Sequence, residues 1–516
     1  MLPWPVSRAV LPAILAAGAA VACAQPTGLV LHLDVPDDST LAPDSAATVT
    51  IEARRAGAAP ITITAPLDGA SFDLGDLPVG EVTSLRALLR GDNDRLVGYG
   101  VATAPVIVGE VADVTVPVRR PMVYLAGPSN RLATMDPTRD RADYQGQVPT
   151  SFTPGLVAAI GGEEVAVADG DQIRLLRTSD HQFAESTIAL PGPARTAAAS
   201  RDGRVAVYGH GGASPGFVVI DRASGARSDV TTTTPPDRVA VSEDGATIAV
   251  LLAACAQTPC APSSVVVTTA AAPSADDVRV VGPVVDLAVS ASGRVLLAPA
   301  DRSAVDELDG DVVELVQIDN RRALAPPWRA RRLAVHGEVV WAVGVEPFFV
   351  DPGPTGSPFD NVEVAPAVRV ARIELTDGGA GAVRVIDAFD YGEALVTASV
   401  EGQTVFQELG ANPVVVDGVA VGPLGDQLAI VLHGDFASES VTDGIDVLIP
   451  AMTGRSAYYL LVSDSGSVVQ RVRTRCEVSF EAGGLADWSC RNRAEIDAPV
   501  GGAYTPSSAT ILFGTP

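Results

Sequence analysis

The sequence predicts an all-β protein with two domains, a small β-sandwich followed by a ring of similar sheets. At 516 residues, the chain is longer than a domain with a single hydrophobic core ordinarily is. The composition is rich in Ala, Val, Gly, Pro, Thr and Ser and poor in aromatic residues, which suits short strands and tight turns. Beyond the N-terminus no segment carries a long apolar helical stripe, whereas alternating strands and turn residues recur to the end of the chain.

The chain is strongly acidic, with a formal charge of −26 at pH 7, and all 36 of its positive side chains are Arg. An acidic surface repels nucleic acid and anionic lipid headgroups, which argues against a nucleic-acid partner and against a polybasic membrane contact. The simplest interpretation is that the excess acid keeps a large exported protein soluble.

Residues 1–24 have the pattern of a secretory signal. Arg8 supplies a sparse positive start, and the apolar stretch from Ala9 to Val21 has the length of a signal core. That stretch is shorter than the roughly 20 residues needed to span a bilayer. We therefore expect residues 1–24 to direct export and to lie outside the fold.

The cleavage region Ala20-Val21-Ala22-Cys23 resembles a bacterial lipobox, in which small residues precede a lipidated Cys that becomes the mature N-terminus. The family usually has Leu where this chain has Ala20. The run Ala22-Cys23-Ala24 also fits the site of ordinary signal peptidase, which would release a soluble secreted protein. If this region is a lipobox, we expect Cys23 to be lipidated and the mature chain to start at Cys23.

The cysteine count favours the lipid-anchored form. Four of the five cysteines lie in two close pairs, which can close as local disulfides in an oxidising compartment: Cys255 with Cys260, and Cys476 with Cys490. Cys23 is then the odd thiol, which lipidation would consume. A zinc site built from the four is disfavoured, because neither pair has knuckle spacing and no His lies close to either.

Residues 28–120 predict the first domain. The pattern has a period of two, as in Ala47–Ala53 and Asp113–Val118, and turn residues such as Leu67-Asp68-Gly69 punctuate it. About seven strands in roughly ninety residues is the density of an antiparallel sandwich. The run Phe72–Gly80, followed by a strand and a Gly-rich turn, resembles immunoglobulin-like or transthyretin-like modules of bacterial surface proteins.

Residues 121–516 contain an internal repeat of two alternating strands joined by a short turn with Ser and Gly. The clearest copies are Ala197–Val207, Val239–Val250, Leu287–Leu297 and Leu333–Ala342. When equivalent turn positions are aligned, from Gly161 to Thr505, the steps are 39, 42, 48, 46, 86 and 83 residues. The first four steps have the length of a four-stranded β-propeller blade.

The repeat predicts a propeller of about seven blades. We interpret the two long steps as insertions, at Glu346–Pro366 and at Arg475–Pro499, although hidden blades would also account for them. The two ends of the domain are expected to close the ring, with Met122–Ala126 sharing a blade with Ala503–Phe513. Six or eight blades remain alternatives.

The Ser-x-Asp-Gly-x-x-apolar phrasing of the turns, as in Ser242-Glu243-Asp244-Gly245, resembles bacterial propellers of the YVTN surface-layer and lactonase-like group. Together with the lipobox, the whole chain resembles a myxobacterial-type cell-envelope lipoprotein. The resemblance implies the propeller architecture over residues 121–516 and says little about activity, because propellers host many unrelated functions.

The sequence contains no recognisable catalytic set: no haem-attachment motif, nucleophile elbow, zinc-protease helix or phosphate loop. His210, His336 and His433 fall in or after repeat segments and could face one rim, but unrelated turn positions are the simpler interpretation. Acidic turns such as Asp169-Gly170-Asp171 could hold calcium, yet Asp-Gly also suits an ordinary turn. We predict no catalytic residues, no metal ligands and no cofactor.

These observations lead to a hypothesis of function. We expect a non-enzymatic lipoprotein, anchored to the membrane through its N-terminal lipid on the outer membrane or periplasmic face, whose propeller binds or holds an envelope protein or glycan. A metal-dependent, lactonase-like hydrolase and a structural surface-layer component are the alternatives.

Overall fold

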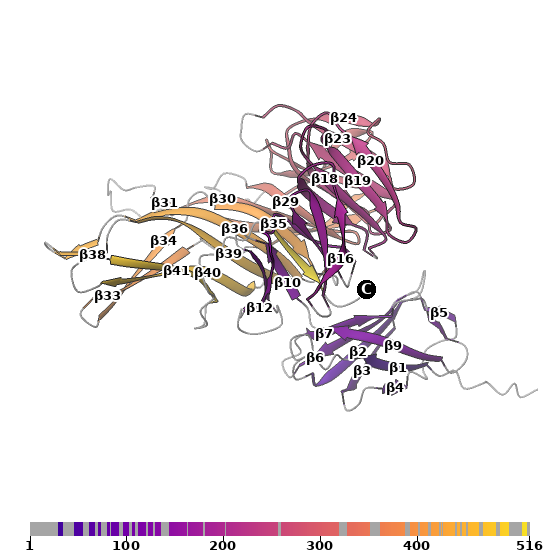
Figure 1. Cartoon of the computed structure of the whole chain (residues 1–516), viewed down its shortest axis with the longest axis horizontal. Helices are drawn as coiled ribbons and strands as arrows, with labels where there is room; N and C mark the ends of the chain where they lie inside the picture. Colours follow the sequence, from indigo (N-terminus) through magenta and orange to yellow (C-terminus); the bar gives the residue numbers. More distant parts are fainter. Residues whose placement is uncertain are drawn as a thin grey trace, which may run out of the picture.

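The computed structural model is all-β, as the sequence predicts, and contains a β-propeller (Figure 1). It describes residues 29–34, 46–54, 61–67, 71–73, 80–82, 84–91, 96–102, 106–108, 112–119, 122–126, 130–135, 144–161, 164–178, 181–201, 203–255, 260–318, 328–350, 362–386, 393–400, 403–410, 414–422, 425, 427–438, 441–443, 446–449, 452–463, 468–480, 486–494 and 508–512. The predicted signal segment, residues 1–24, and Cys23 lie outside these residues. Over the described ranges, no helix has the length and apolarity that crossing a bilayer requires.

The N-terminal domain contains the strands β1 (Leu29–Asp34), β2 (Thr48–Arg54), β3 (Ile61–Pro66), β4 (Ser71–Asp73), β5 (Gly80–Val82), β6 (Ser84–Arg90), β7 (Leu96–Val101), β8 (Val106–Val108) and β9 (Ala112–Arg119). Seven of these described strands bond in the order β3-β2-β6-β7-β9-β1-β4, and β5 pairs with β8. Alternate residues of β1, β2, β6 and β9 point into one apolar cluster, which includes Leu31, Val49, Leu85 and Val116.

Within the residues that the structure describes, the second domain contains six four-stranded sheets, which we number as blades in chain order. Blades 1 and 2 are formed by β42 (Ser508–Leu512), β10 (Met122–Ala126), β11 (Arg131–Met135) and β12 (Tyr144–Pro149), and by β13 (Val157–Ala159), β14 (Glu164–Asp169), β15 (Gln172–Arg177) and β16 (Phe183–Ala189).

Blades 3 and 4 follow the same antiparallel order from the centre outward. They contain β17 (Ala194–Ala199), β18 (Val205–His210), β19 (Gly216–Asp221) and β20 (Ala226–Thr231), and then β21 (Pro236–Val241), β22 (Thr247–Leu252), β23 (Ser263–Thr269) and β24 (Val278–Val281).

Blades 5 and 6 continue the series. They contain β25 (Val284–Val289), β26 (Val295–Pro299), β27 (Ala304–Asp309) and β28 (Asp311–Gln317), and then β29 (Arg329–His336), β30 (Val339–Val350), β31 (Val362–Thr376) and β32 (Gly379–Ile386). The last two blades differ in length, because β30 and β31 run well beyond their neighbours.

The predicted count of about seven blades needs correction. Within the described residues, six sheets have the four-stranded form of a blade, and the rest of the ring is occupied by a larger sheet of different construction. The large sheet has the order β34-β33-β40-β39-β36-β35, with β41 paired to β40. Its strands are β33 (Glu393–Val400), β34 (Gln403–Gly410), β35 (Val414–Val421), β36 (Gln427–Ser438), β39 (Met452–Ser463), β40 (Val468–Phe480) and β41 (Ala486–Ala494), beside the small pair β37 (Val441–Asp443) and β38 (Asp446–Ile449).

The first strands of the sheets make a closed series around the centre, with contacts in the order β42, β13, β17, β21, β25, β29, β35 and back to β42. The ring closes where the sequence predicts, because β42 pairs with β10 in a register that places Met122 opposite Leu512. Second strands such as β18 are buried along their whole length, since both of their faces pack against neighbouring sheets. This double burial explains why these strands are almost entirely apolar.

Candidate functional site

The antiparallel order gives the ring two different ends. Turns between the first and second strands of each blade lie at one end, which we call the turn end, and the connections to the third strand and to the next blade lie at the other, the connection end. At the connection end of blade 3, the loop from β18 to β19 is bonded to the loop that enters the blade from blade 2. The amide of Gly211 in the first loop donates to the carbonyl of Pro193 in the second. Since Met122 pairs with Leu512, the N-terminal domain joins the ring at the turn end.

The repeated turns share one hydrogen-bonding design. In blades 3, 4 and 5 the Ser hydroxyl that opens the turn accepts a bond from a backbone amide at its far side, from Val205 to Ser200, from Thr247 to Ser242 and from Arg294 to Ser290. A Gly with positive φ completes each turn, with φ of 69° at Gly203, 76° at Gly245 and 86° at Gly293. A side chain at Gly245 would also collide with the neighbouring blade, because an added Cβ would lie 2.7 Å from Val205.

The turns are tied to one another through Glu243. Its carboxylate accepts a hydrogen bond from the amide of Gly337 in blade 6, at 2.6 Å, and one from the guanidinium of Arg201 in blade 3, at 3.3 Å. The imidazole Nδ1 of His336 lies 3.8 Å from the same carboxylate. In addition, the amide of Ala291 in blade 5 donates to the carbonyl of Gly337. One acidic residue therefore links turns of blades 3, 4 and 6 at the turn end.

The N-terminal domain contacts this end of the ring through Tyr99. The Tyr99 side chain is only 1% exposed and is hydrogen-bonded to Arg201. Burial raises the pKa of the Tyr99 phenol, which keeps it neutral, and its oxygen accepts the bond from the Arg201 guanidinium. Arg201 thus joins Tyr99 to the turns held by Glu243.

Polar groups on the inner strands are used to hold blades together. Each inner strand of blades 3 to 6 has a bulge, and in blades 3, 4 and 5 the next residue bonds to the following blade. Thr196 accepts from the amide of Val239 at 3.2 Å, Arg238 donates to Asp286, and Asp286 accepts from the amide of Leu333 at 2.8 Å. Asp286 is 3% exposed and also accepts from the Arg238 guanidinium at 3.0 Å. Its carboxylate is thus occupied by structural bonds.

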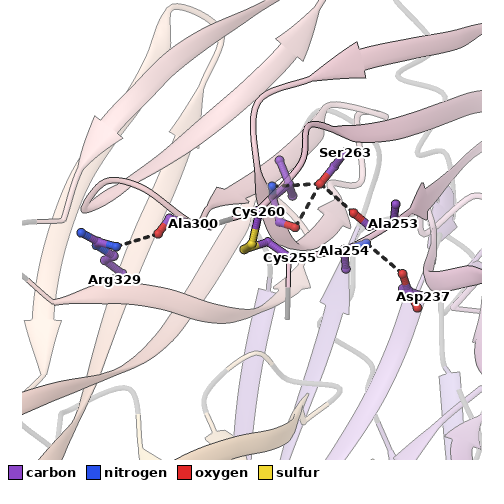
Figure 2. The surroundings of a disulfide bond; sticks show 9 residues. Asp237, Ala253, Ala254, Cys255, Cys260, Ser263, Ala300 and Arg329 are labelled. Carbon is purple, nitrogen blue, oxygen red and sulfur yellow. Dashed lines mark hydrogen bonds between the residues drawn. A yellow bond between two sulfur atoms is a disulfide. The ribbon is translucent and has the colours of Figure 1, made fainter. Parts of the chain in front are cut away.

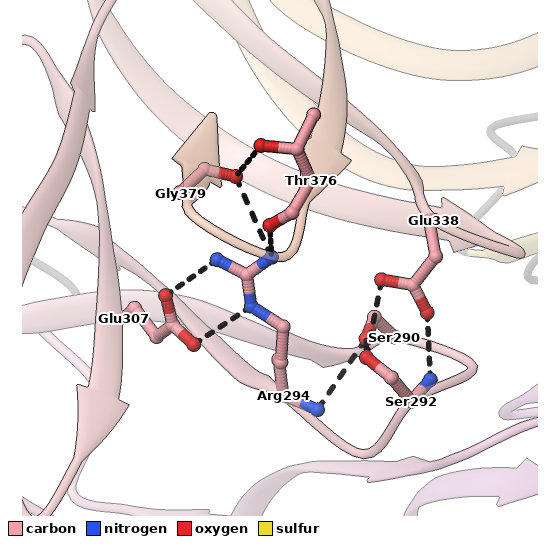
Figure 3. A network of polar contacts seen from close by, with 7 residues as sticks. All are labelled: Ser290, Ser292, Arg294, Glu307, Glu338, Thr376 and Gly379. Carbon is pink, nitrogen blue, oxygen red and sulfur yellow. Dashed lines mark hydrogen bonds and ion pairs between the residues drawn. The ribbon is translucent and has the colours of Figure 1, made fainter. Parts of the chain in front are cut away.

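A second link joins blades 5 and 6 at the turn end (Figure 3). The Arg294 guanidinium forms a two-pronged pair with Glu307, at 2.7 and 2.6 Å, and donates to the carbonyl of Thr376 at 2.9 Å. Glu338 accepts from the amide and the hydroxyl of Ser292, at 2.6 and 3.1 Å. These contacts fix the relative position of the two blades, of which blade 6 carries the longest strands.

The structure contains a disulfide between Cys255 and Cys260, in the connection between β22 and β23, with the two Cα atoms 5.5 Å apart (Figure 2). The amide of Cys255 donates to the carbonyl of Val284 in blade 5, so the bridged loop is attached to the neighbouring blade. Beside it, the Ser263 hydroxyl donates to the carbonyl of Ala253 at 3.0 Å. The pair is the one that the sequence predicts.

The other predicted cysteine sites are placed less fully. Cys476 and Cys490 are directly opposite each other in the β40–β41 ladder, a position from which antiparallel strands can be bridged, but their side chains are outside the described set. Their disulfide stays a prediction. Cys23, the predicted lipidation site, likewise lies outside the described residues.

The histidines do not meet at one rim. His336 lies at the turn end, whereas His210 ends β18 and His433 pairs with Val415, both toward the connection end. His181 is hydrogen-bonded to Tyr124 at 3.1 Å in blade 1. Among the described residues, no group of three or more His, Cys, Asp or Glu is arranged to hold a metal ion.

The connection end carries a feature that the sequence repeat does not predict. The hairpin β33–β34, the pair β37–β38, the strand β41 and the far halves of β30, β31, β36 and β39 all belong to connections at this end, beside blade 6 and the large sheet. Figure 1 shows them as a long extension of strands that leaves the ring on one side, and we call it the arm. The parallel pairing of β33 with β40 makes the arm continuous with the large sheet.

The arm at the connection end is the candidate functional site. It is anchored on the ring at its base, where β36 and β39 continue from buried residues such as Ile430 and Val462. Sequence reasoning placed insertions in part of this region, but it did not predict their strands or their assembly into one body.

No family model matches the sequence, and no curated protein matches it. Solved structures with similar form include Kuenenia stuttgartiensis hydrazine synthase, which is 14% identical over 66% of this chain and 88% of that one, with a TM-score of 0.31. The β-propeller domain of Myceliophteria thermophila Cps50 (Swd1) is 11% identical over 63% of this chain and 90% of that one, with a TM-score of 0.37. These similarities are too distant to bear on activity, and the strand order itself identifies the propeller.

Proposed function

We propose that the chain is a lipid-anchored protein of the bacterial cell envelope whose propeller is a rigid binding and scaffold module. The main observation behind the proposal is the arm, a set of strands that extends from one side of the ring. The blades of that ring are hydrogen-bonded to each other. Glu243, Asp286 and Arg294 each bond between blades, and such links suit a platform that holds a binding surface in place.

The polar groups of the inner strands support a non-catalytic role. Asp286 and Thr196 accept bonds from the next blade, so these groups serve the ring itself. Propellers of the YVTN and lactonase-like group, which the turns resemble, remain the proposed type. The N-terminal domain is proposed to be an immunoglobulin-like or transthyretin-like sandwich that spaces the ring from the membrane.

The proposed anchor rests on Cys23 and the small residues before it. Metabolic labelling with a fatty-acid analogue in a bacterial host should label the wild-type chain and leave Cys23→Ser unlabelled, with Cys255→Ser as the matched control. Labelling of Cys23→Ser, or none of the wild type, would remove the anchor from the proposal.

The binding role is tested separately. Cross-linking in intact cells, followed by solubilisation and purification, should recover a defined envelope component with the wild-type chain. A chain that is correctly exported and folded but brings down no component would contradict the binding role.

A further inference from the structure

Blade 6 contains an arginine whose guanidinium has no partner. Arg331 lies on β29 and is half-buried. Among the arginines whose side chains the structure describes, it alone makes no hydrogen bond, ion pair or ring contact through its guanidinium. Partly buried charges are ordinarily paired, because taking a charge out of water is costly. An unpaired one therefore marks a place where a counter-ion would be stabilised.

Arg331 is the bulge residue of its strand. The register of β29 with β30 shifts between Ala330 and Arg332, which leaves Arg331 as the extra residue. The inner strands of blades 3 and 4 have the same bulge, at Arg195 and Asp237, and these two side chains form an ion pair of 2.9 Å. Because the inner strands surround the axis, the bulges occupy equivalent places around the opening of the ring at its connection end. Arg331 belongs to this circle.

A second arginine adds positive charge beside Arg331. The Arg329 guanidinium donates to the carbonyl of Ala300 at 2.9 Å, and within the described part of the chain it is paired with no carboxylate (Figure 2). Burial and then the charge of Arg329 lower the pKa of Arg331, whereas a carboxylate beside it would raise that pKa. The corresponding bulge of the large sheet holds Asp417, whose side chain is outside the described set.

The backbone that carries Arg331 is held firmly. Trp328 and Ala330 are buried, and the Ser303 hydroxyl donates to the carbonyl of Trp328. The Arg332 guanidinium donates to the carbonyl of Arg331 at 2.8 Å. A binding group on a fixed base loses less conformational freedom when its ligand arrives.

The two arginines lie at the base of the arm. Arg329 is paired with Val345, and no later residue of β30 pairs with β29. From there β30 continues to Val350, and β31 returns alongside it from Val362. An anion at Arg331 would thus lie between the opening of the ring and the arm.

We propose that Arg331, together with Arg329, binds a compact oxyanion, the carboxylate or phosphate group of a ligand held at the base of the arm. The planar guanidinium presents a fork of N–H donors that matches both groups, and the bonds to a charged acceptor are stronger than those to a neutral one. The inference rests on the proposed binding role and names the chemical group that the site recognises.

The net charge of −26 opposes the approach of any anion, so the local charge has to outweigh it. Charges more than about 8 Å away are largely screened at physiological salt. Two guanidinium groups beside a partly buried ligand act through a lower effective dielectric constant than water has. They can therefore outweigh the distant charge for one small group, whereas a polyanion would extend beyond the two arginines and gain no such compensation.

The test is isothermal titration calorimetry of the full chain with inorganic phosphate and with succinate, in buffers matched in ionic strength with chloride. The wild type should bind at least one of them, and the tighter one identifies the recognised group. Arg331→Gln should weaken binding by about tenfold or more, because a charged donor is lost, and Arg329→Gln should weaken it less. The matched control, Arg279→Gln, removes an arginine paired with Asp277 on an outer strand and should bind as the wild type does.

Thermal unfolding separates lost binding from lost folding. Without added anion, Arg331→Gln should unfold at the wild-type temperature or above it, because it removes a partly buried charge that has no counter-charge. Saturating phosphate or succinate should raise the unfolding temperature of the wild type and not that of Arg331→Gln.

Three results would overturn the inference: no binding of either anion by the wild type beyond that of chloride, unchanged binding by Arg331→Gln, or an equal loss in Arg279→Gln. Cross-linking that still recovers an envelope component would then leave the broader binding role standing without this site.

Discussion

The Glu243 carboxylate in the turn of blade 4 accepts a 2.6 Å hydrogen bond from the backbone amide of Gly337, which belongs to blade 6. The two residues are 94 positions apart in the sequence, and the bond passes over the intervening blade. It shows that the turn end of the ring is a connected layer and not a set of independent hairpins.

Replacing Glu243 by Ala should lower the free energy of unfolding by about 1–2 kcal/mol, because the amide of Gly337 and the guanidinium of Arg201 both lose a charged acceptor. Urea denaturation followed by circular dichroism measures the change. Glu374→Ala is the control, since that carboxylate pairs with Arg372 at a more exposed position, and its loss should cost less than about 0.5 kcal/mol.

The pair of Arg294 and Glu307 should show a coupling free energy of about 1 kcal/mol in a double-mutant cycle with Gln at each position. Both side chains are about four-fifths buried, and the bond to Glu307 is the main cause that raises the pKa of Arg294. The same cycle on Arg279 and Asp277, a more exposed pair, should give a coupling near zero. Equal coupling in the two pairs would contradict the assignment of Arg294 as a link between blades.

Removal of the Cys255–Cys260 disulfide by Ser at both positions should reduce the free energy of unfolding by about 2 kcal/mol, the loop-entropy value for so short a loop. Reducing agent should lower the stability of the wild type and leave that of the double variant unchanged at this site. Free-thiol counts before and after reduction check that the bridge is formed in the purified protein, and two reactive thiols in this loop without reduction would count against it.

Asp306 should give the stability a measurable pH dependence. It is 3% exposed in blade 5, where it pairs with Arg302, and burial raises the pKa of its carboxyl above the ordinary value. The folded state therefore holds the proton more tightly than the unfolded chain does. The contribution of Asp306 to stability is largest below the unfolded pKa and is lost as pH rises through the raised folded value.

Asp306→Asn removes this loss, so the stability of the variant relative to the wild type should increase as the pH is raised from below 4 toward neutrality. Urea denaturation at a series of pH values provides the measurement, with Asp301→Asn, an exposed neighbour, as the control. A difference between Asp306→Asn and the wild type that does not vary with pH would show that the carboxyl titrates normally.

The blades were predictable because each carries its own local signal. Ser200, Ser242 and Ser290, which align in the repeat, have the same hydrogen-bonding role in the structure, and the Gly that follows each one adopts a positive φ. Turn chemistry of this kind depends on residues within five positions of each other, so a single sequence displays it.

The large sheet and the arm were not predictable in the same way. The pairing of Leu395 with Arg475 joins strands eighty positions apart in parallel, and no turn or repeat marks it. The sequence therefore indicates insertions at the two long steps of the repeat. In the structure these segments together form the large sheet and the arm. The bond from Gly337 to Glu243 was equally hidden, because it depends on the geometry of the closed ring.

The pairing of β42 with β10 has a consequence for biosynthesis. The inner edge of β10 stays without its hydrogen-bonding partner until Ser508–Leu512 has been delivered, after every other blade has been made. An exposed strand edge readily pairs with foreign strands. Synthesis that stops before these residues would thus leave an open arc prone to aggregation, and the pairing of β42 with β10 removes this exposed edge.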